Sequence, residues 1–288
     1  WIDNDVHQAP PQRVNGTGLS ATWIGHATVL VQTGGLNILT DPFFSKRASP
    51  FQFAGPKRVR NPGVALQDLP PIDLILLSHN HYDHMDLPAL RKLVRHHDAA
   101  IVTPHGNARI VNRWIRQANV IERGWHEPFE HSPDVLVTPT PALHWSKRTF
   151  KDRNKALWSA FMVEAGNRKV YFGADTGFGT GEHFMQTGDR YGAPDLALLP
   201  IGAYEPRWFM KAQHINPDEA VQAHKLLGAK ASLAIHHATI QLTDEAIGAP
   251  VEALQAAKLK HGIEDHAFRA ISVGETWQLD GLAKASAA

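Results

Sequence analysis

Short apolar runs alternate with turn-forming residues along the 288-residue chain, at lengths that suit β-strands. We expect strands at about residues 20–24, 28–32, 36–40, 72–77, 100–103, 135–138, 159–164, 169–174, 195–199, 231–235 and 269–273. The segments TGGLN at 33–37 and EAGNRK at 164–169 contain the glycine and asparagine of tight turns, so each predicts a hairpin.

Helical signals lie mainly in the later part of the chain. They predict helices at about residues 87–96, 105–117, 217–227 and 243–260. Asn216 can cap the third helix, Pro217 fits its first turn and Gly228 can end it, while Thr243 opens the fourth. Hairpins come first and strands mixed with helices follow, which indicates an α/β protein whose sheets are covered by helices.

The composition is that of an ordinary globular protein, with 43% hydrophobic and 20% charged residues. A net charge of +1 gives no overall field toward nucleic acid, so we expect no nucleic-acid partner. No apolar run approaches the roughly 18–20 residues of a transmembrane helix. The chain has 18 His and no Cys, which excludes thiolate ligands and leaves imidazole and carboxylate for any metal.

Metal-binding side chains follow the strand expected at 72–77. Residues 79–84 read His-x-His-x-Asp-His, a pattern that rarely follows a strand by chance. Residues two apart in an extended segment point the same way, so His79 and His81 can share one metal. If the chain then turns into a helix, Asp83 and His84 swing toward a second position beside the first.

Three further apolar runs also end in a possible ligand, at His144, Asp175 and His236. A short carboxylate such as Asp175 can bridge two cations. The pattern therefore predicts two groups around Asp175, namely His79, His81 and His144 in one, and Asp83, His84 and His236 in the other. Neutral imidazole with carboxylate suits zinc best, with iron or manganese as alternatives.

These residues resemble the metallo-β-lactamase fold superfamily. Longer segments resemble its N-acylphosphatidylethanolamine-hydrolysing phospholipase D family over about residues 20–240: WIGHATVLVQTGGLNILTDPFFSKRASP, GPKRVR, LPPIDLILLSHNHYDHMD, FGADTG and PIGAYEPRWFMKAQHINPDEAV. The resemblance implies an αββα sandwich, in which helices flank two mixed sheets and two zinc ions lie at the sheet edges. It also implies hydrolysis of a phosphodiester to an N-acylethanolamine and phosphatidic acid. The family's seven ligands map onto the seven residues above.

A single domain of this fold is expected over residues 19–280, after an N-terminal arm at 1–18 and before a frayed tail at 281–288. One departure from the family is His237, which stands where a Trp is usual. The sequence does not decide between a monomer and a homodimer. For localisation, the cytoplasm or the periphery of a membrane is the expectation.

The expected chemistry is attack on phosphorus by a hydroxide that two metals hold, because such a pair ionises water near neutral pH. Asp83 and Asp175 are the catalytic candidates among the ligands. His214 is a candidate for contacting phosphate, with local helix packing as the alternative. His26 and Asp41 are expected to orient ligand imidazoles, although an Asp before Pro42 also suits a simple turn.

Three segments mix aromatic and basic residues, at 43–60, 145–155 and 204–211. This mixture suits a membrane surface, and it also suits single-stranded nucleic acid or aromatic packing within the protein. We expect a phospholipid or another anionic substrate and peripheral contact with a membrane. The substrate-binding candidates are Lys46, Arg47, Phe51, Arg58, Arg60, Trp145, Tyr204, Arg207 and Trp208.

Two other functions compete with a phospholipase. One is a metal-dependent lactonase or phosphoesterase that acts on a small soluble anionic ester. The other is a metal-stabilised binding module without turnover, which seven ligands disfavour because structural zinc sites usually have four. A nuclease, an antibiotic-hydrolysing enzyme and an iron oxygenase rank lower.

Overall fold

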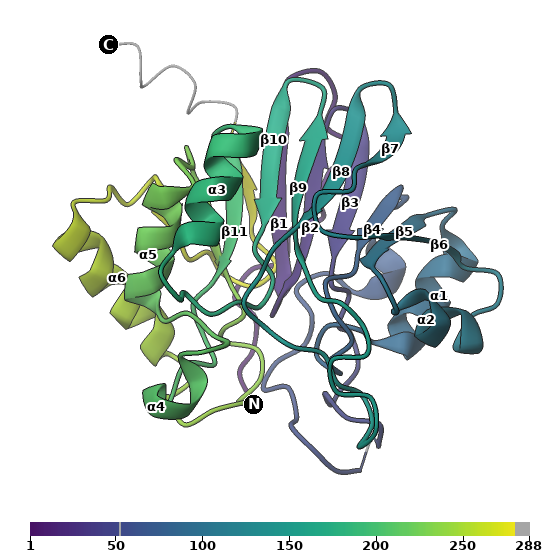
Figure 1. Cartoon of the computed structure of the whole chain (residues 1–288), viewed down its shortest axis with the longest axis horizontal. Helices are drawn as coiled ribbons and strands as arrows, with labels where there is room; N and C mark the ends of the chain where they lie inside the picture. The colour runs from purple at the N-terminus through teal and green to yellow at the C-terminus, as the bar shows by residue number, and fades with distance from the viewer. Residues whose placement is uncertain (52, 280–288) are drawn as a thin grey trace.

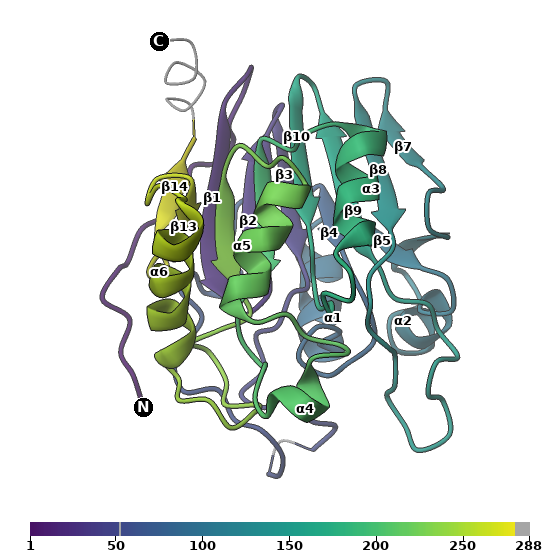
Figure 2. The same ribbon diagram turned by 60° about the vertical axis from the view of Figure 1, so that its left-hand side comes forward.

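The computed structural model describes residues 1–51 and 53–279. The expected tail at 281–288 and the expected domain end at residue 280 lie outside the described residues. Two seven-stranded sheets lie face to face, and helices cover both outer faces (Figures 1 and 2). This arrangement confirms the predicted αββα sandwich.

The first sheet has the order β14-β1-β2-β3-β4-β5-β6. Its strands are β1 (Leu19–Gly25), β2 (Thr28–Thr33), β3 (Leu36–Thr40), β4 (Leu74–Leu76), β5 (Ala100–Pro104), β6 (Asn119–Arg123) and β14 (Thr276–Gln278). Neighbours from β14 to β3 are antiparallel, and those from β3 to β6 are parallel. Gly34 and Gly35 take φ values of 57° and 76° in the two-residue turn after β2, which confirms the first predicted hairpin.

The second sheet has the order β13-β12-β11-β10-β9-β8-β7. Its strands are β7 (Phe129–Ser132), β8 (Val135–Thr140), β9 (Ala160–Ala165), β10 (Arg168–Phe172), β11 (Leu196–Pro200), β12 (Ser232–Ile235) and β13 (Phe268–Arg269). Neighbours from β7 to β10 are antiparallel, and those from β10 to β13 are parallel. The turn between β9 and β10 confirms the second predicted hairpin.

Helices α1 (Leu87–His96) and α2 (Ala108–Trp114) cover the first sheet, as Figures 1 and 2 show. Helices α3 (Glu182–Tyr191), α5 (Pro217–Leu226) and α6 (Ala249–His261) cover the second. The short helix α4 (Arg207–Met210) lies at one end of the sandwich, and a 3₁₀ turn spans Leu66–Asp68. Every helix of the described residues is too short or too polar to cross a lipid bilayer.

The central strands of both sheets are buried on both faces. In β2, Val29 and Val31 pack between the sheets, whereas Leu30 packs in the cluster under α1. In β10, Phe172 packs between the sheets and Tyr171 faces the helices of the other side. Successive side chains of a strand point to opposite faces, so helix cover makes both sets apolar. This explains why the strands read as continuous apolar runs.

Two predicted helices have the wrong limits. The helix expected at 243–260 begins only at Ala249, with Pro250 in its first turn. Before it, the carboxylate of Glu245 accepts hydrogen bonds from the backbone N–H groups of Ala203 and Glu205, which holds that segment as a loop. The helix expected at 105–117 is limited to Ala108–Trp114, because Gly106 has a φ of 91°.

Other differences concern elements with weak sequence signals. The strand expected at 269–273 ends at Arg269. Strands β6 and β7 were not predicted, and both are partly exposed edge strands with little apolar alternation. Strand β14 and helix α4 have three and four residues, too few for a period to show. Helix α3 was missed because glycines flank and interrupt it.

Candidate metal centre

The candidate metal centre lies at one end of the sandwich, where strands of both sheets stop. Strand β4 of the first sheet leads to His79, and β8, β10 and β12 of the second lead to His144, Asp175 and His236. All four residues are buried. The packed strands therefore deliver ligands from distant parts of the chain to one place.

The first group contains three histidines. His79 Nε2 lies 2.9 Å from His81 Nδ1, and His144 Nε2 lies 3.3 Å from the same His81 atom. Ligand atoms of the three residues lie within 4.8 Å of one another. The structure thus brings together the residues that the sequence assigned to one metal.

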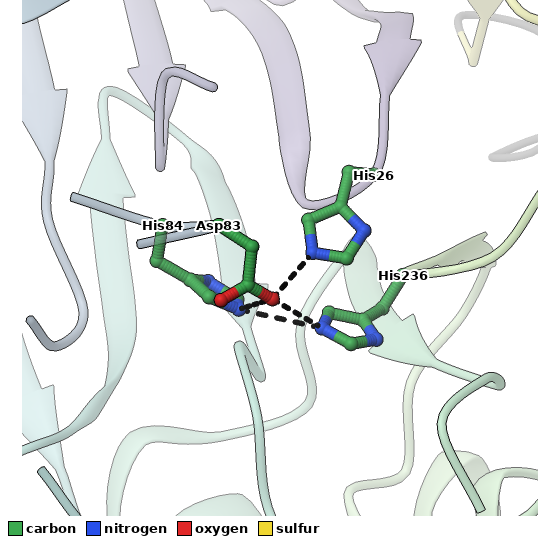
Figure 3. Close-up of side chains that lie close together, drawn as sticks. All are labelled: His26, Asp83, His84 and His236. Atoms are coloured by element: carbon green, nitrogen blue, oxygen red, sulfur yellow. Dashed lines mark hydrogen bonds and ion pairs between the residues drawn. The ribbon is translucent and has the colours of Figure 1, made fainter. Parts of the chain in front are cut away.

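The second group contains Asp83, His84 and His236, with His26 beside them (Figure 3). Asp83 Oδ2 lies 3.3 Å from His84 Nε2 and 3.5 Å from His236 Nε2. The two imidazole Nε2 atoms are 3.3 Å apart. The residues that the sequence assigned to the second metal therefore also converge.

Asp175 lies between the two groups. Its Oδ2 is 3.1 Å from His84 Nε2, 3.7 Å from His144 Nε2 and 3.9 Å from His79 Nε2. Its Oδ1 is 3.1 Å from His236 Nε2. One carboxylate thus faces both imidazole groups, which is the geometry of a bridging ligand.

The donor set fits divalent cations. Two buried carboxylates, Asp83 and Asp175, have pKa values held well below the usual range: burial raises them, but the neighbouring histidines lower them more. The negative charge of these carboxylates favours a cation at this place.

The pKa values of the histidines differ between the groups. Burial lowers the pKa of His79 and His144 well below the usual value and that of His81 to about 4, which keeps these imidazoles neutral. Burial also lowers the pKa of His84 and His236, but Asp175 raises it more, to about 9 for His236. The negative carboxylate that stabilises a proton on these two imidazoles would also stabilise a metal cation bound to them.

Asp41 orients ligands of both groups. Its Oδ2 accepts a hydrogen bond from His84 Nδ1 at 2.6 Å and another from Ser78 Oγ at 2.5 Å. Ser78 Oγ in turn lies 2.8 Å from His79 Nδ1, which can donate to it. Both histidines then carry the proton on Nδ1 and leave Nε2 free for a metal. Sequence reasoning missed Ser78, whose only signal is its place directly before a ligand.

His26 contacts both Asp83 and His236: its Nε2 lies 2.9 Å from Asp83 Oδ2, and its ring centroid lies 4.0 Å from that of His236 (Figure 3). Its backbone φ is 56°, and Asp41, Ala174 and His236 also have positive φ values, of 27°, 49° and 60°. Such conformations are costly for residues other than glycine and gather at functional sites. The surrounding fold therefore holds this end of the sheets in a strained arrangement.

Two contacts from loops of the second sheet hold His144 and the segment 79–86. His144 Nδ1 lies 3.0 Å from the Gln213 carbonyl oxygen, which sets the same tautomer as in His79. Arg148 donates to the carbonyls of Asn80 and Met85 and lies over the Tyr82 ring at 4.1 Å. Arg148, in the segment after β8, thus holds the segment 79–86 in place through these contacts. The sequence did not predict this role of Arg148.

His214 is buried at the edge of the centre. Its ring lies 5.1 Å from that of His144 and 5.7 Å from that of His236. Burial lowers its pKa to about 4, so the imidazole is neutral at pH 7. Its Nδ1 has no hydrogen-bond partner among the described residues, which leaves it available to a ligand.

Comparisons with known proteins agree with this geometry. The model of the β-lactamase superfamily domain matches residues 36–237. N-acyl-phosphatidylethanolamine-hydrolyzing phospholipase D 1 of Caenorhabditis elegans is 40% identical over 276 residues, which are 91% of this chain and 76% of that protein. The chain belongs to the metallo-β-lactamase superfamily and, within it, to the N-acylphosphatidylethanolamine-hydrolysing phospholipase D family.

A second member of this family is N-acyl-phosphatidylethanolamine-hydrolyzing phospholipase D, mitochondrial, of Saccharomyces cerevisiae, with 34% identity over 252 residues. Those residues are 86% of this chain and 53% of the yeast protein, so the chain spans about half the yeast protein. The structure of Igni18, a metallo hydrolase from Ignicoccus hospitalis, shares the fold with a TM-score of 0.67 at 22% identity, covering 91% and 98% of the two chains. Family and buried cluster together support a metal-dependent hydrolase.

The substrate-binding candidates of this family member fall into two sets. Trp145 packs against the ligand His81, with ring centroids 4.5 Å apart. The exposed or partly exposed candidates are Lys46, Arg47, Phe51, Arg60 and Trp208. Tyr204 is largely buried, at 9% exposure.

Two of the candidate arginines bind acceptors of the fold itself. Arg58 is only 3% exposed, and its guanidinium donates to the carbonyls of Phe43 and Arg60. Arg207 donates to both carboxylate oxygens of Glu219 at 2.8 Å and to the His214 carbonyl. Both guanidinium groups therefore bind acceptors that hold the loops around the centre.

His237, the departure from the family pattern, is buried behind the centre. It stacks on Trp23 with ring centroids 4.4 Å apart. Burial lowers its pKa to about 3, so it is neutral. An imidazole at this position therefore packs as an aromatic ring against Trp23.

Proposed function

We propose that this protein is a zinc-dependent phosphodiesterase that hydrolyses N-acylphosphatidylethanolamine or a related phospholipid in a phospholipase D-type reaction. The observation that carries the proposal is the position of Asp175 between two imidazole groups. Five imidazoles with carboxylates, and no Cys in the chain, favour zinc. The names of the nematode and yeast relatives support the substrate.

The two groups of donors fit two zinc ions. When bound, such a pair would ionise water near pH 7 and neutralise charge on the phosphate oxygens. The neutral imidazoles of His79, His81 and His144 would hold one ion, and Asp83, His84 and His236 the other. Asp41 keeps His84 directly, and His79 through Ser78, in the tautomer that ligation needs. The protein's part is thus to fix the donors before substrate arrives.

Asp83 is the proposed proton acceptor. In the reaction, a water oxygen bonds to phosphorus, and the bond from phosphorus to the oxygen of the N-acylethanolamine breaks. Asp83 Oδ2 takes the proton of the water, while the hydrogen bond from His26 Nε2 at 2.9 Å stabilises its charge before transfer. The departing oxygen takes up the proton that Asp83 accepted from the water, which gives an N-acylethanolamine and phosphatidic acid.

His214 is proposed to bind the phosphate. Its neutral ring can donate one hydrogen bond, and its unpartnered Nδ1 lies in a buried, water-poor place where such a bond is strong. A donor aimed at the phosphate oxygens stabilises the charge that builds up in the transition state. This role predicts a larger effect of His214 on turnover than on folding.

A lipid substrate is supported by an aromatic rim around this end of the molecule, which consists of Phe51, Phe53, Phe150, Trp208 and Phe209. These side chains are 57%, 82%, 99%, 80% and 58% exposed. Helix α4 and the loops near residues 50 and 150 lie at the same end of the sandwich (Figure 1). Exposed rings with nearby Lys and Arg suit the headgroup layer of a membrane.

The test starts with zinc analysis of the purified protein. Turnover is then measured on detergent-dispersed N-acylphosphatidylethanolamine, on bis(p-nitrophenyl) phosphate and on a soluble lactone. The proposal expects about two zinc ions per chain and the highest kcat/KM on the lipid. A preference for the small soluble esters would support the lactonase or phosphoesterase alternative, and full activity after exhaustive chelation would overturn the metal mechanism.

A further inference from the structure

A second cavity lies beside the metal centre. This basic groove has a volume of about 940 Å³ and is lined by α1, α2, the segment 148–155 and residues 45–50. Helix α1 contributes Arg91, Lys92 and Arg95, α2 contributes Arg109 and Arg113, and the segment 148–155 adds three more cations. The proposed reaction uses none of the helix cations.

The groove has many more positive than negative side chains. Its two acids, Asp86 and Asp152, accept hydrogen bonds from backbone N–H groups, including those of Ser45 and Thr149. Within residues 1–51 and 53–279, none of the helix cations and none of the three cations at 148–155 forms an ion pair. Uncompensated cations around one hollow favour an anionic ligand.

Apolar side chains complete the groove. Met85, Leu87, Pro88 and Ile110 line it together with Trp114, which is 57% exposed. On the segment 148–155, the fully exposed Phe150 stands between two lining residues. A ligand with an anionic group and an apolar part therefore matches the groove better than inorganic phosphate alone.

We propose that the basic groove binds the headgroup of an anionic phospholipid at a membrane surface, as a second lipid distinct from the substrate. Each Lys or Arg near an anionic surface adds to attraction, and rings such as Phe150 can enter the headgroup layer. A nucleic acid fits less well, because the net charge of +1 gives the chain no extended field toward a polyanion. The inference extends the proposed lipid function, but binding is measurable without turnover.

The test uses the full chain with vesicles of phosphatidylcholine alone or mixed with phosphatidylserine. The groove variant R95Q/R113Q removes one cation from each helix, and neither arginine makes a hydrogen bond or ion pair in the described structure. The control R190Q/K225Q removes the same charge from exposed positions outside the groove, on α3 and α5. Co-sedimentation gives the vesicle affinity at low and physiological salt.

We expect the groove variant to bind phosphatidylserine vesicles at least about tenfold more weakly than the unaltered protein, and the control to change less than about threefold. Turnover of detergent-dispersed lipid should be equal in both, which separates this inference from the proposed reaction. Equal losses in the two variants, or affinity indifferent to phosphatidylserine, would overturn the proposal. So would loss of single-stranded DNA binding by the groove variant with vesicle binding intact.

Discussion

The segment 79–86 separates two regions, the metal centre and the basic groove, in which charged side chains have different surroundings. Asp83 and His84 face the metal centre, whereas Tyr82 and Met85 line the basic groove. In the centre, each carboxylate lies within 3.5 Å of histidine nitrogens. In the groove, the cations of α1 and α2 form no ion pair with described residues. Buried charge requires fixed partners, while exposed charge is solvated and is free to meet a ligand.

The comparison predicts that substitutions in the centre lower turnover and metal binding strongly. Substitutions at the groove and the rim should have small effects, limited to vesicle affinity and dependent on salt concentration. The largest effect should come from D175N, because it removes charge from the carboxylate between both groups. We expect turnover to fall by about 10³-fold, with loss of bound zinc. Turnover and elemental analysis measure this.

The matched control is D189N, which makes the same change at an exposed position of α3. It should retain full activity and metal. If D175N kept its activity within about tenfold of the unaltered protein, the bridging role of this residue would have to be abandoned.

A smaller effect is expected for S78A. Without the hydroxyl, His79 Nδ1 loses its link to Asp41, so the ring is less well oriented and less basic. Loss of such a supporting contact typically lowers metal affinity or activity by about 10–100-fold. Competition with a chelator measures the affinity, and S78T should restore part of it.

The control for S78A is S159A, because Ser159 is also buried and its Oγ has no hydrogen-bond partner among the described residues. We expect near-normal metal affinity in this variant. Equal affinity in S78A and S159A would mean that the hydroxyl of Ser78 does not orient the ligand.

Asp195 lies away from the metal centre, and it tests how much a carboxylate with fixed charged partners contributes to folding stability. Burial raises its pKa, but the hydrogen bond from Lys169 N–H and the Lys230 and Arg168 cations lower it more. The pKa of Asp195 is therefore lower in the folded than in the unfolded protein. The contribution of this carboxylate to the free energy of unfolding is complete above about pH 4 and is lost as the pH falls further. D195N should lower the free energy of unfolding by about 1–2 kcal/mol at pH 7.

Denaturant unfolding at several pH values measures this difference. It should be constant from neutral pH to about pH 5 and should shrink in acid. Turnover per folded molecule should not change, since the residue is remote from the ligands. A difference that grew in acid would contradict the sign of the pKa shift.

The smallest effect is expected at the rim. F150A removes a 99% exposed ring, so folding stability and turnover in detergent should not change. If the ring enters the headgroup layer, affinity for vesicles should fall by roughly threefold to tenfold. L259A, which removes an 85% exposed side chain from α6, is the control and should leave vesicle affinity unaltered. Equal effects of the two variants would remove Phe150 from the interface.

Much of the fold was predictable because both hairpins have local turn signals and the central strands are long apolar runs. Edge strands β6 and β7 lack such runs, since only part of each strand is buried. Helix α6 starts later than its pattern suggests, because Glu245 binds backbone groups 40 and 42 residues earlier in the chain. Local sequence carries no record of that long-range contact.

The seven candidate ligands could be named from sequence because each follows an apolar run or belongs to the spaced motif at 79–84. Their supporting contacts were harder to predict. Ser78 and Arg148 act through partners that only the folded chain brings near. Arg58 was expected among the residues that meet substrate, but it is enclosed by carbonyls of its own loop. Composition alone does not tell a solvated arginine from a buried one.

By itself, the sequence determined an α/β fold and the donor types, because these depend on period, spacing and residue chemistry along short stretches. The sandwich and the family followed from the resemblance of its longer motifs to known proteins. Only the tertiary structure decided that Asp41 contacts His84 directly and reaches His79 through Ser78, that Arg148 contacts the segment 79–86, and that the cations of α1 and α2 share a groove. These are distances between residues far apart in the chain. They are set by how the two sheets and their helices pack, which no local pattern encodes.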